Sequence, residues 1–347
     1  MNKTLQQTLL NLTHASCVKK TEVIQSLWSG YGEIARFQVD NGCSDTVVIK
    51  HVKLLDQTQM AKPSHPRGWN TDLSHNRKIK SYEVESHWYE TFSGQCDDAC
   101  RVPRCYGVSA VENEFLIVLE DLDRSGFSVR KTKAAITDMQ LCLNWLAHFH
   151  ATFLTSSVTN NAALKNTLTK HEKGLWSVGC YWHLDTRPDE LAALQDKPLK
   201  YYAQKIDELL KACPYQTLVH GDAKLANFCF ADNGKQVAAV DFQYVGVGIG
   251  MKDVAYFIGS CLDGRECEQY AESLLDDYFQ YLHKAMKQNK CSIDSTSVEA
   301  AWRPLFSVAW ADFHRFLKGW STEHWKIHGF SERITQQALQ FLSLKNG

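Results

Sequence analysis

The sequence predicts an α+β fold in which a small antiparallel-sheet N-terminal lobe precedes a larger, mainly helical C-terminal lobe. Its 347 residues are enough for two domains of about 150 residues each. The first part of the chain alternates strand-type runs with Gly and Asn-Gly turns, and the remainder is dominated by helical spacing of apolar residues. We therefore expect an N-terminal sheet lobe over residues 1–122 and a C-terminal helical lobe over residues 123–347.

Composition and charge exclude several classes of protein. The hydrophobic fraction of 44% and the charged fraction of 22% are typical of a globular chain with a sizeable core. Lys and Arg (38) nearly balance Asp and Glu (39), which argues against a broad nucleic-acid interface. No apolar run is as long as a membrane span, and the 12 scattered cysteines are typical of free thiols in a reducing cytoplasm. We expect a cytoplasmic protein with neither a nucleic-acid nor a membrane partner.

The N-terminal lobe is expected to be a sheet with one helix packed on it. The strand-type runs are VIQSLWSGYG, EIARFQVD, DTVVIKHVKL, VPRCYGVSAV and EFLIVLEDL. The helical segment SHNRKIKSYEVESHWYETF lies between the third and fourth of them. Before the sheet, MNKTLQQTLLNLTHASC is predicted to be an amphipathic helix because it is too polar for a secretory signal.

The C-terminal lobe begins with a strongly periodic helix. ITDMQLCLNWLAHFHATF places one apolar face at helical spacing, formed by Ile136, Met139, Leu143, Leu146 and Phe149. Further helices are expected over PDELAALQDKPLKYYAQKIDELLKA, ECEQYAESLLDDYFQYLHKAMKQ and EAAWRPLFSVAWADFHRFLKGW. Two strand-like runs interrupt them, TLVHG and QVAAVDF, joined through NFCFADNGK, whose Asp-Asn-Gly is a hairpin turn signal.

The segment HGDAKLANF groups polar side chains of the kinds that phosphoryl transfer requires. Such a site needs an acidic group beside the acceptor hydroxyl, ligands for Mg²⁺ and a cation near the phosphates. Asp222 can orient and deprotonate the acceptor, and Lys224 can neutralise charge on the transferred group. Asn227, together with Asp241 on the next strand-like run, supplies hard oxygen ligands suited to Mg²⁺.

The N-terminal lobe offers the groups that a nucleotide would need. Lys50 ends the interior run VVIK, where an unpaired ammonium is costly to bury, and Glu85 is favoured over Glu83 as its carboxylate partner. Gly30 and Gly32, in the turn SGYGE, are expected to fold over phosphates, although a plain hairpin turn explains them nearly as well.

The run EFLIVLEDL ends the N-terminal lobe at Glu120, Asp121 and Leu122. We expect the backbone of this hinge to hold the edge of an adenine. Clefts between lobes are a preferred location for ligands, so the nucleotide is expected there.

The order of these motifs resembles the protein-kinase-like fold. H-G-D in place of the H-R-D of protein kinases is similar to the aminoglycoside phosphotransferase and choline kinase group. LWSGYGEIARF, YWHLDTRPDEL and WADFHRFLKGW resemble the ecdysteroid kinase-like branch of that group. The resemblance implies ATP and Mg²⁺ as cofactors, Asp222 as catalytic base, Asn227 and Asp241 as metal ligands, and a pair between Lys50 and Glu85.

Two departures from the protein-kinase pattern bear on the substrate. Gln243 follows Phe242 where protein kinases have Gly, and no A-P-E segment follows, so a protein substrate is not expected. His220 is interpreted as a structural histidine. The aromatic segments 181–190 and 311–320 are candidates for an acceptor pocket, but for any single aromatic residue a place in the core is the favoured interpretation.

The leading hypothesis is an ATP- and Mg²⁺-dependent kinase for a hydroxyl of a small organic molecule. One alternative is a choline- or ethanolamine-type kinase, which would need an aromatic cage with an acidic partner. The other is a catalytically silent nucleotide-binding pseudokinase. The identity of the acceptor, the preference between ATP and GTP, and the oligomeric state are left open by the sequence.

Overall fold

The computed structural model describes residues 3–27, 30–54, 71–111, 114–157 and 173–344. By its internal contacts the chain divides into two compact units. The N-terminal unit is Met1–Arg130 with Cys229–Val240, and the C-terminal unit is Lys131–Phe228 with Asp241–Gly347. The lobe boundary expected at residue 122 stays a prediction.

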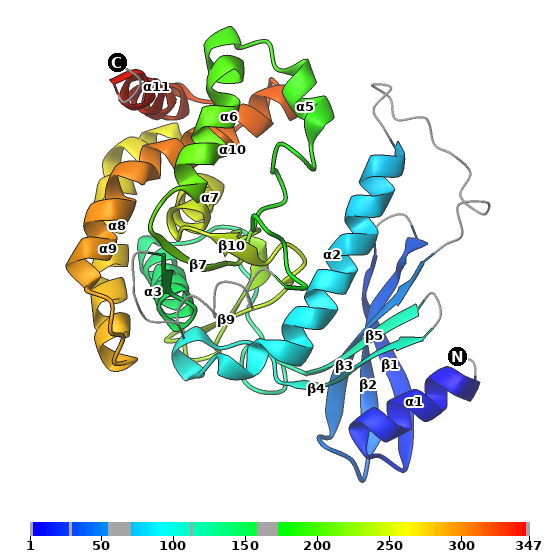
Figure 1. The fold of residues 1–347 in the computed structure, drawn as a ribbon. Coiled ribbons are helices and arrows are strands. Elements are labelled where there is room, and N and C mark those ends of the chain that lie inside the picture. The colour runs from blue at the N-terminus through cyan, green and yellow to red at the C-terminus, as the bar shows by residue number, and fades with distance from the viewer. Residues whose placement is uncertain (1–2, 28–29, 55–70, 112–113, 158–172, 345–347) are drawn as a thin grey trace. The chain divides into compact units, whose positions relative to one another are not determined.

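The N-terminal unit contains a five-stranded antiparallel sheet in the order β1-β2-β3-β5-β4 (Figure 1). Its strands are β1 Cys17–Ser26, β2 Gly32–Asp40, β3 Thr46–Lys53, β4 Cys105–Val111 and β5 Glu114–Glu120. The predicted α+β class, with an antiparallel sheet followed by a mainly helical part, is confirmed.

Two helices pack on this sheet, α1 Lys3–Thr13 and α2 Thr71–Thr91. Because side chains alternate along a strand, β3 presents one set of residues to each face. Val47 and Ile49 share a core cluster with Leu9 of α1, whereas Val52 shares one with Tyr82 of α2. The expectation of one packed helix was therefore wrong, because the amphipathic N-terminal helix also covers the sheet.

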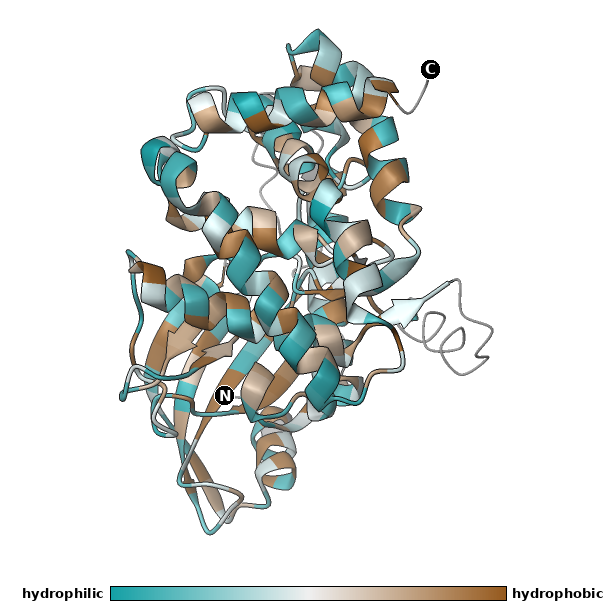
Figure 2. Cartoon of the chain, turned by 90° about the vertical axis from the view of Figure 1, so that its left-hand side faces the viewer, coloured by the Kyte–Doolittle hydropathy of each residue, from teal (hydrophilic) through white to brown (hydrophobic). Residues whose placement is uncertain are grey.

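The C-terminal unit is mainly helical, and hydrophilic and hydrophobic residues alternate around its helices (Figure 2). Its helices are α3 Ile136–Thr152, α5 Pro188–Ala193, α6 Lys197–Lys211, α7 Met251–Cys261, α8 Gly264–Gln288, α9 Ser295–Trp302, α10 Phe306–Trp320 and α11 Gly329–Leu344. Short 3₁₀ turns occur at η4 Leu225–Asn227 and η5 Arg303–Leu305 of this unit, and at η2 Ser93–Gln95 and η3 Asp98–Cys100 of the N-terminal unit. The apolar face predicted for α3 is confirmed, since Met139, Leu143, Leu146 and Phe149 are fully buried.

Two helices expected to be continuous are broken. The stretch 188–212 is α5 followed by α6, because Asp196 caps a new helix whose second residue is Pro198. The stretch 299–320 is interrupted at Pro304, where η5 separates α9 from α10. Helices α7 and α11 were not predicted.

The short strands pair differently from the expectation. Strand β7 Tyr215–Val219 lies between β6 Thr155–Ser156 and β10 Gly246–Gly248. The predicted Asp-Asn-Gly turn instead joins β8 Phe228–Phe230 to β9 Val237–Ala239. Pairing TLVHG with QVAAVDF was wrong because a tight turn joins its immediate neighbours, and the run before this turn is FCF.

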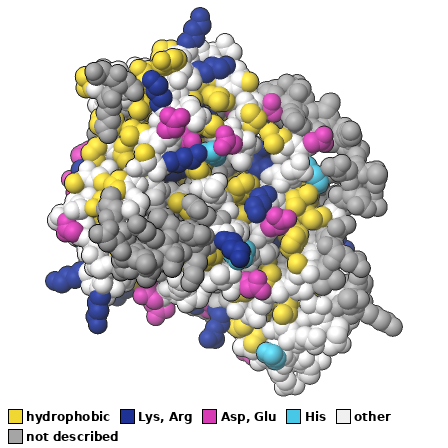
Figure 3. Space-filling view, in the orientation of Figure 1, with side chains coloured by type: hydrophobic (Ala, Val, Ile, Leu, Met, Phe, Trp, Pro, Cys, Tyr) yellow, Lys and Arg dark blue, Asp and Glu magenta, His cyan; other side chains and the backbone are white. Residues whose placement is uncertain are grey.

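No helix in the described part of the chain is long and apolar enough to cross a membrane. On the face shown in Figure 3, basic and acidic side chains lie interspersed over the described surface.

A buried charge cluster ties α7 to α10. Asp312 of α10 accepts hydrogen bonds from Lys252 Nζ of α7 at 2.8 Å, from Arg315 at 2.9 Å and from the Trp182 indole at 2.8 Å. Burial opposes ionisation of Asp312, but Lys252 and Arg315 outweigh it and hold the pKa of that carboxyl below its ordinary range. One carboxylate therefore balances two cations that are only 2% and 0% exposed.

Replacing Asp312→Asn should destabilise the protein by about 3–5 kcal/mol, because two buried cations would lose their counter-charge. Equilibrium urea unfolding at neutral pH measures this loss. A lowered pKa in the folded state stabilises the protein above the ordinary aspartate pKa, and that stability is lost as the pH falls toward the lowered value. The gap between wild type and variant should therefore narrow below about pH 4.

The matched control is Glu272→Gln on α8, whose side chain is 83% exposed and lies 3.6 Å from Arg303. Its unfolding midpoint should stay close to that of the wild type because exposed ion pairs contribute little. If Asp312→Asn lowers the free energy of unfolding no more than Glu272→Gln does, the stabilising role of the buried cluster is contradicted.

Candidate active site

Asp222 lies in the loop after β7 and is 5% exposed. Tyr256 donates its hydroxyl to Asp222 Oδ1 at 3.0 Å, and Lys224 Nζ donates to Oδ2 at 2.8 Å. Asn227 Nδ2 donates to the backbone oxygen of Asp222 at 2.8 Å and to Oδ2 at 3.2 Å. The structure therefore brings together three of the predicted residues, because Lys224 and Asn227 both bind the carboxylate of Asp222.

The charges around Asp222 act against one another. Burial raises the pKa of the Asp222 carboxyl, Lys224 opposes that rise, and Asp241 adds to it. Asp241 is thus near enough for its charge to reach Asp222. Burial and then the Asp222 charge raise the pKa of Tyr256, so its hydroxyl stays protonated and acts as a donor.

The loop that carries Asp222 is held by a buried carboxylate on α7. Asp253 is fully buried and accepts from the backbone N–H of His220 at 2.6 Å and of Gly221 at 3.0 Å. His150 Nε2 lies 3.2 Å from the same carboxylate. His220 Nδ1 accepts from the Asp222 N–H at 3.3 Å, which agrees with its interpretation as a structural histidine.

Gly221 occupies a position that a side chain could not share. Its φ is +77°, in the left-handed region, and an added Cβ would lie 2.1 Å from the backbone oxygen of Tyr244. The chain therefore needs glycine immediately before Asp222.

Asn227 and Asp241, the predicted metal ligands, end η4 and follow β9 respectively. The Asn227 amide nitrogen donates to Asp222, so the amide oxygen Oδ1 of Asn227 points away from Asp222. Asp241 has a φ of +69°, an uncommon conformation for a residue with a side chain and one that clusters at functional sites. A carboxylate and an amide oxygen are hard donors of the kind that suits Mg²⁺, which takes few protein ligands when phosphates are also present, and the role of Asn227 and Asp241 as its ligands stays a prediction.

Within the described residues, no group of three or more His, Cys, Asp or Glu side chains forms a metal-binding cluster. A dedicated all-protein cage is therefore not seen there, and the donor set above relies on an amide oxygen.

Lys50 and Glu85 form a buried pair within the N-terminal unit. Lys50 Nζ of β3 lies 2.5 Å from Glu85 Oε2 of α2, and the two residues are 4% and 1% exposed. Glu83, the competing candidate, is half exposed and lies 3.7 Å from Lys80. The structure therefore joins Lys50 to Glu85 in preference to Glu83.

Gly30 lies between β1 and β2, and Gly32 is the first residue of β2, with φ of +76° and +127°. An added Cβ at Gly32 would lie 2.0 Å from the backbone oxygen of His51 on the neighbouring strand. Close backbone approach thus explains Gly32 within the hairpin itself, and a phosphate contact at this turn stays a prediction.

Glu120, the last residue of β5, has its carboxylate engaged by an arginine. Both of its oxygens accept from Arg101, at 2.6 and 2.7 Å, and one also accepts from the Arg104 N–H at 2.9 Å. The Glu120 N–H also donates to the Arg104 oxygen at 2.8 Å, so an adenine contact at Glu120 would be limited to its backbone oxygen and stays a prediction.

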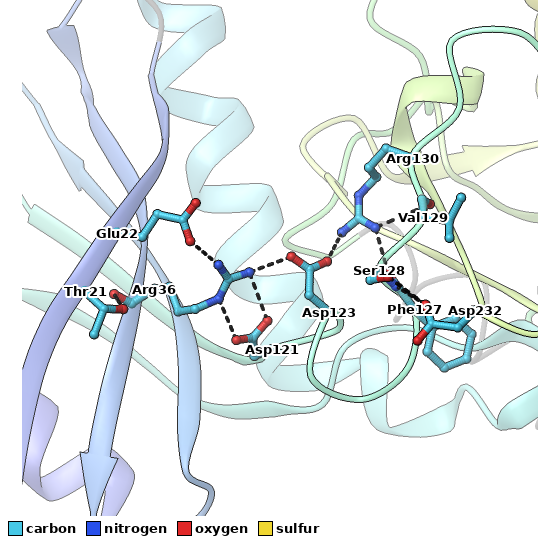
Figure 4. A network of polar contacts seen from close by, with 10 residues as sticks. All are labelled: Thr21, Glu22, Arg36, Asp121, Asp123, Phe127, Ser128, Val129, Arg130 and Asp232. Carbon is cyan, nitrogen blue, oxygen red and sulfur yellow. Dashed lines mark hydrogen bonds and ion pairs between the residues drawn. The ribbon is translucent and has the colours of Figure 1, made fainter.

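Arg36 of β2 anchors the segment that follows β5 (Figure 4). Its Nε lies 2.7 Å from Asp121 Oδ2, and its Nη2 lies 2.5 Å from Asp123 Oδ2. A third carboxylate, Glu22, also pairs with it. The Asp121 side chain is thus paired with Arg36. The next residue in the sequence, Leu122, is buried.

The β8–β9 hairpin joins the same segment (Figure 4). Ser128 donates its hydroxyl to Asp232 at 2.6 Å, and Val129 forms a bridge with Phe230. The turn between Asn227 and Asp241 is therefore attached to residues just beyond the predicted hinge.

Several residues around Asp222 were not identified from the sequence. Tyr256 and Asp253 belong to α7, which was not predicted. Met251, Val254, Ala255 and Ile258 are all buried and follow helical spacing, so the periodicity was a signal for this helix. The hydrogen bonds from α7 to the loop, in contrast, arise only from tertiary packing.

The aromatic segments considered for an acceptor pocket are largely buried. Trp182, Phe313 and Phe316 share one cluster with Tyr256, and Tyr181 packs against it. The Tyr181 ring lies 5.7 Å from the Tyr256 ring. Some of these aromatics are thus both core residues and close neighbours of the residue that binds Asp222.

Comparisons with known proteins support one family. Residues 74–178 and 180–291 match the model of the ecdysteroid kinase-like family. A search of curated proteins gives no match.

Similar solved structures include a microcompartment-associated aminopropanol kinase, with 14% identity, 99% of this chain and 94% of that chain covered, and a TM-score of 0.45. An ethanolamine kinase from Plasmodium vivax has 11% identity and a TM-score of 0.47, with 98% of this chain and 86% of that chain covered. A choline kinase from Streptococcus pneumoniae has 12% identity and a TM-score of 0.40, with 99% of this chain and 98% of that chain covered. All three TM-scores lie below 0.5, so the assignment rests on the family model.

Replacing Gly221→Ala should destabilise the protein, because both the backbone conformation and the nearby Tyr244 oxygen oppose a Cβ. Gly234→Ala is the matched control, since its φ is +67° but nothing lies within 4 Å of an added Cβ. The variant at Gly221 should lose about 1–3 kcal/mol more than the control, the usual cost of overpacking. Urea midpoints measure both, and equal losses would contradict the steric argument.

Replacing Asp253→Asn should loosen the loop, because the two N–H groups donate to different oxygens of Asp253 and an amide has only one oxygen. Hydrogen exchange at the amides of His220 and Gly221 should become about tenfold faster or more. Asp263→Asn, at the exposed N-cap of α8, should instead affect only the amides that it caps, those of Arg265 and Glu266. Unchanged exchange in the loop would show that Asp253 does not hold it.

Proposed function

This chain belongs to the ecdysteroid kinase-like family, and we propose from that premise that it is an ATP- and Mg²⁺-dependent kinase whose acceptor is a hydroxyl of a small organic molecule. The observation that carries the proposal is the setting of Asp222. Its buried carboxylate is fixed by Tyr256, Lys224 and Asn227, and it lies within reach of the charge of Asp241.

Asp222 is the proposed catalytic base. A carboxylate has about four lone-pair sites, so the hydrogen bonds from Tyr256, Lys224 and Asn227 leave it able to accept from an acceptor hydroxyl. Asp222 would orient that hydroxyl and take its proton as the oxygen attacks phosphorus. Asp253 accepts from the backbone N–H groups just before Asp222 and so keeps the Asp222 carboxylate in one position, which orientation of the acceptor requires.

Asn227 and Asp241 are the proposed Mg²⁺ ligands. Bound there, Mg²⁺ would offset negative charge on the phosphates during transfer. Lys224 is proposed to add a positive charge beside the transferred group, and its pKa is raised because Asp222 outweighs the effect of burial. It therefore remains a cation at neutral pH.

The nucleotide is proposed to be held by residues of the N-terminal unit. Lys50, oriented by Glu85, would bind phosphate oxygens as a point charge. Gly30 and Gly32 would let the backbone of this turn approach the phosphates, and the backbone at Glu120, Asp121 and Leu122 would hold the adenine edge. ATP is the proposed nucleotide.

The acceptor is proposed to be a small molecule and not a protein, because the chain lacks the segments with which protein kinases bind peptides. The 12 free thiols support a proposed location in the reducing cytoplasm.

Replacing Asp222→Asn should abolish most turnover while nucleotide binding survives. Loss of a general base typically lowers the rate by about a hundred- to ten-thousand-fold. ADP release, screened over alcohols, sterols, amino sugars and amino alcohols, measures turnover, and calorimetric titration with Mg-ATP measures binding. Asp276→Asn, at a side chain 52% exposed on α8 in the same unit, is the matched control and should leave both unchanged.

Turnover in the Asp222 variant close to that of the wild type would refute the assignment of the base. Mg-ATP binding by the wild type without ADP release from any acceptor of the panel would favour the nucleotide-binding pseudokinase alternative.

A further inference from the structure

Lys326 lies against three aromatic rings, one of which belongs to the tyrosine that binds Asp222. Its Nζ is 5.1 Å from the centre of the Tyr256 ring, 5.5 Å from that of Phe313 and 5.5 Å from that of Trp325. The same Tyr256 donates its hydroxyl to Asp222 at 3.0 Å. One tyrosine thus contacts both the ammonium and the proposed catalytic carboxylate.

Lys326 differs from the other cations of this aromatic cluster. Lys252 lies over the Trp182 ring but pairs with Asp312 at 2.8 Å. Arg187 lies over two rings of the cluster but pairs with Glu190 at 3.0 Å. Within the described part of the chain, no carboxylate lies within ion-pairing distance of Lys326 Nζ. Aromatic faces are what hold this ammonium, and such contacts are strongest where water is excluded.

The turn between α10 and α11 fixes Lys326 and leaves one side of its cage open. The Lys326 N–H donates to His324 Nδ1 at 3.2 Å, and the Ile327 N–H donates to the His324 oxygen at 2.8 Å. Trp325, one of the three rings, is 56% exposed, whereas Phe313 is 5% exposed. A ligand can therefore approach the cage from solvent.

The charges of the proposed site act on Lys326. Burial lowers its pKa to about 8, the Cys261 and Asp222 groups oppose this shift, and Lys224 adds to it. Lys326 is therefore still mostly protonated at neutral pH. Two cations, Lys224 and Lys326, accompany Asp222.

This arrangement favours some acceptors over others. An ammonium-bearing alcohol needs aromatic faces and a carboxylate, but Lys326 already occupies the faces and would repel a second cation. A neutral body meets no such repulsion where it packs beside the exposed Trp325, and an anionic group would gain an attraction to Lys326.

We propose that Lys326 is a specificity-determining residue of the acceptor site, which selects hydroxyl compounds with an uncharged or anionic body and rejects alcohols that carry an ammonium group. This inference rests on the proposed function and narrows its substrate class. It also separates this chain from a choline- or ethanolamine-type activity, because the cage that would bind the substrate ammonium is occupied by the protein itself.

Matched acceptor pairs test the inference. One pair is choline and its neutral carbon isostere, in which a tert-butyl group replaces the trimethylammonium group. A larger pair is a fused-ring alcohol with and without an amino substituent. The wild type should use the neutral member with a kcat/KM about tenfold to a hundredfold higher, the scale of a like-charge contact in a partly buried site.

Replacing Lys326→Met should reduce this preference, mainly by lowering KM for the charged member, whereas Lys326→Arg should retain it. A merely structural role would affect both members equally. Lys205→Met is the matched control, because Lys205 also lies over two aromatic rings, Tyr201 and Tyr202, but on α6, where Tyr201 is 69% exposed. It should leave the preference unchanged.

Equal use of both members by the wild type, or a preference for the charged member, would overturn the inference. An unchanged preference in Lys326→Met would also overturn it. Binding of the same pairs, measured by calorimetry in the presence of Mg-ADP, reads the discrimination without turnover, and equal affinities for both members would likewise refute it.

The outcomes separate this inference from the proposed function. Turnover that does not depend on Asp222, or no turnover with any acceptor, would count against the kinase assignment. Turnover that depends on Asp222 but is indifferent to acceptor charge would count against Lys326 alone.

Discussion

The carboxylate of Asp253 is the contact on which the proposed catalytic loop depends. It accepts from the backbone of His220 and Gly221 and lies beside His150, which in turn lies 2.9 Å from the Tyr278 hydroxyl. Segments from α3, α7, α8 and the end of β7 therefore converge on one buried acid. A loop with this many buried, satisfied polar contacts is rigid, and a rigid loop can orient a base with little entropic cost during the reaction.

The parts of the fold that the sequence predicted are those governed by local signals. Apolar periodicity identified α3, strand-type runs identified the antiparallel sheet, and the buried setting of Lys50 pointed to Glu85 as its partner. The resemblance to the ecdysteroid kinase-like branch is confirmed by the family model. The failures have equally physical causes. Asp196 and Pro198 restart a helix inside a continuous amphipathic pattern, and the partner of β7 is a strand of three residues that is rich in glycine. The proposed role of Lys326 depends on Tyr256 of α7 and Phe313 of α10, whose rings lie next to its ammonium, and no spacing in the sequence reveals this contact.

The C-terminal unit uses the same aromatic residues for packing and for electrostatics. Trp182 fills the core with no exposed surface, yet its indole N–H is one of the donors that hold Asp312. Tyr256 is likewise buried among rings while its hydroxyl binds Asp222. Interpreting such residues as either core or pocket was too simple, because an aromatic side chain has an apolar body and, in Tyr and Trp, a polar group at its edge.

The hairpin formed by β8 and β9 has a consequence for how this family can vary over evolution. Asn227 precedes this hairpin directly and Asp241 follows it closely, so its register determines the spacing between the two proposed metal ligands. An insertion of one residue into either strand would turn every later side chain to the opposite face. The turn offers little freedom either, since Asp232 is tied to Ser128. Length changes among relatives should therefore be rare between these two positions, even where the surrounding sequence has diverged.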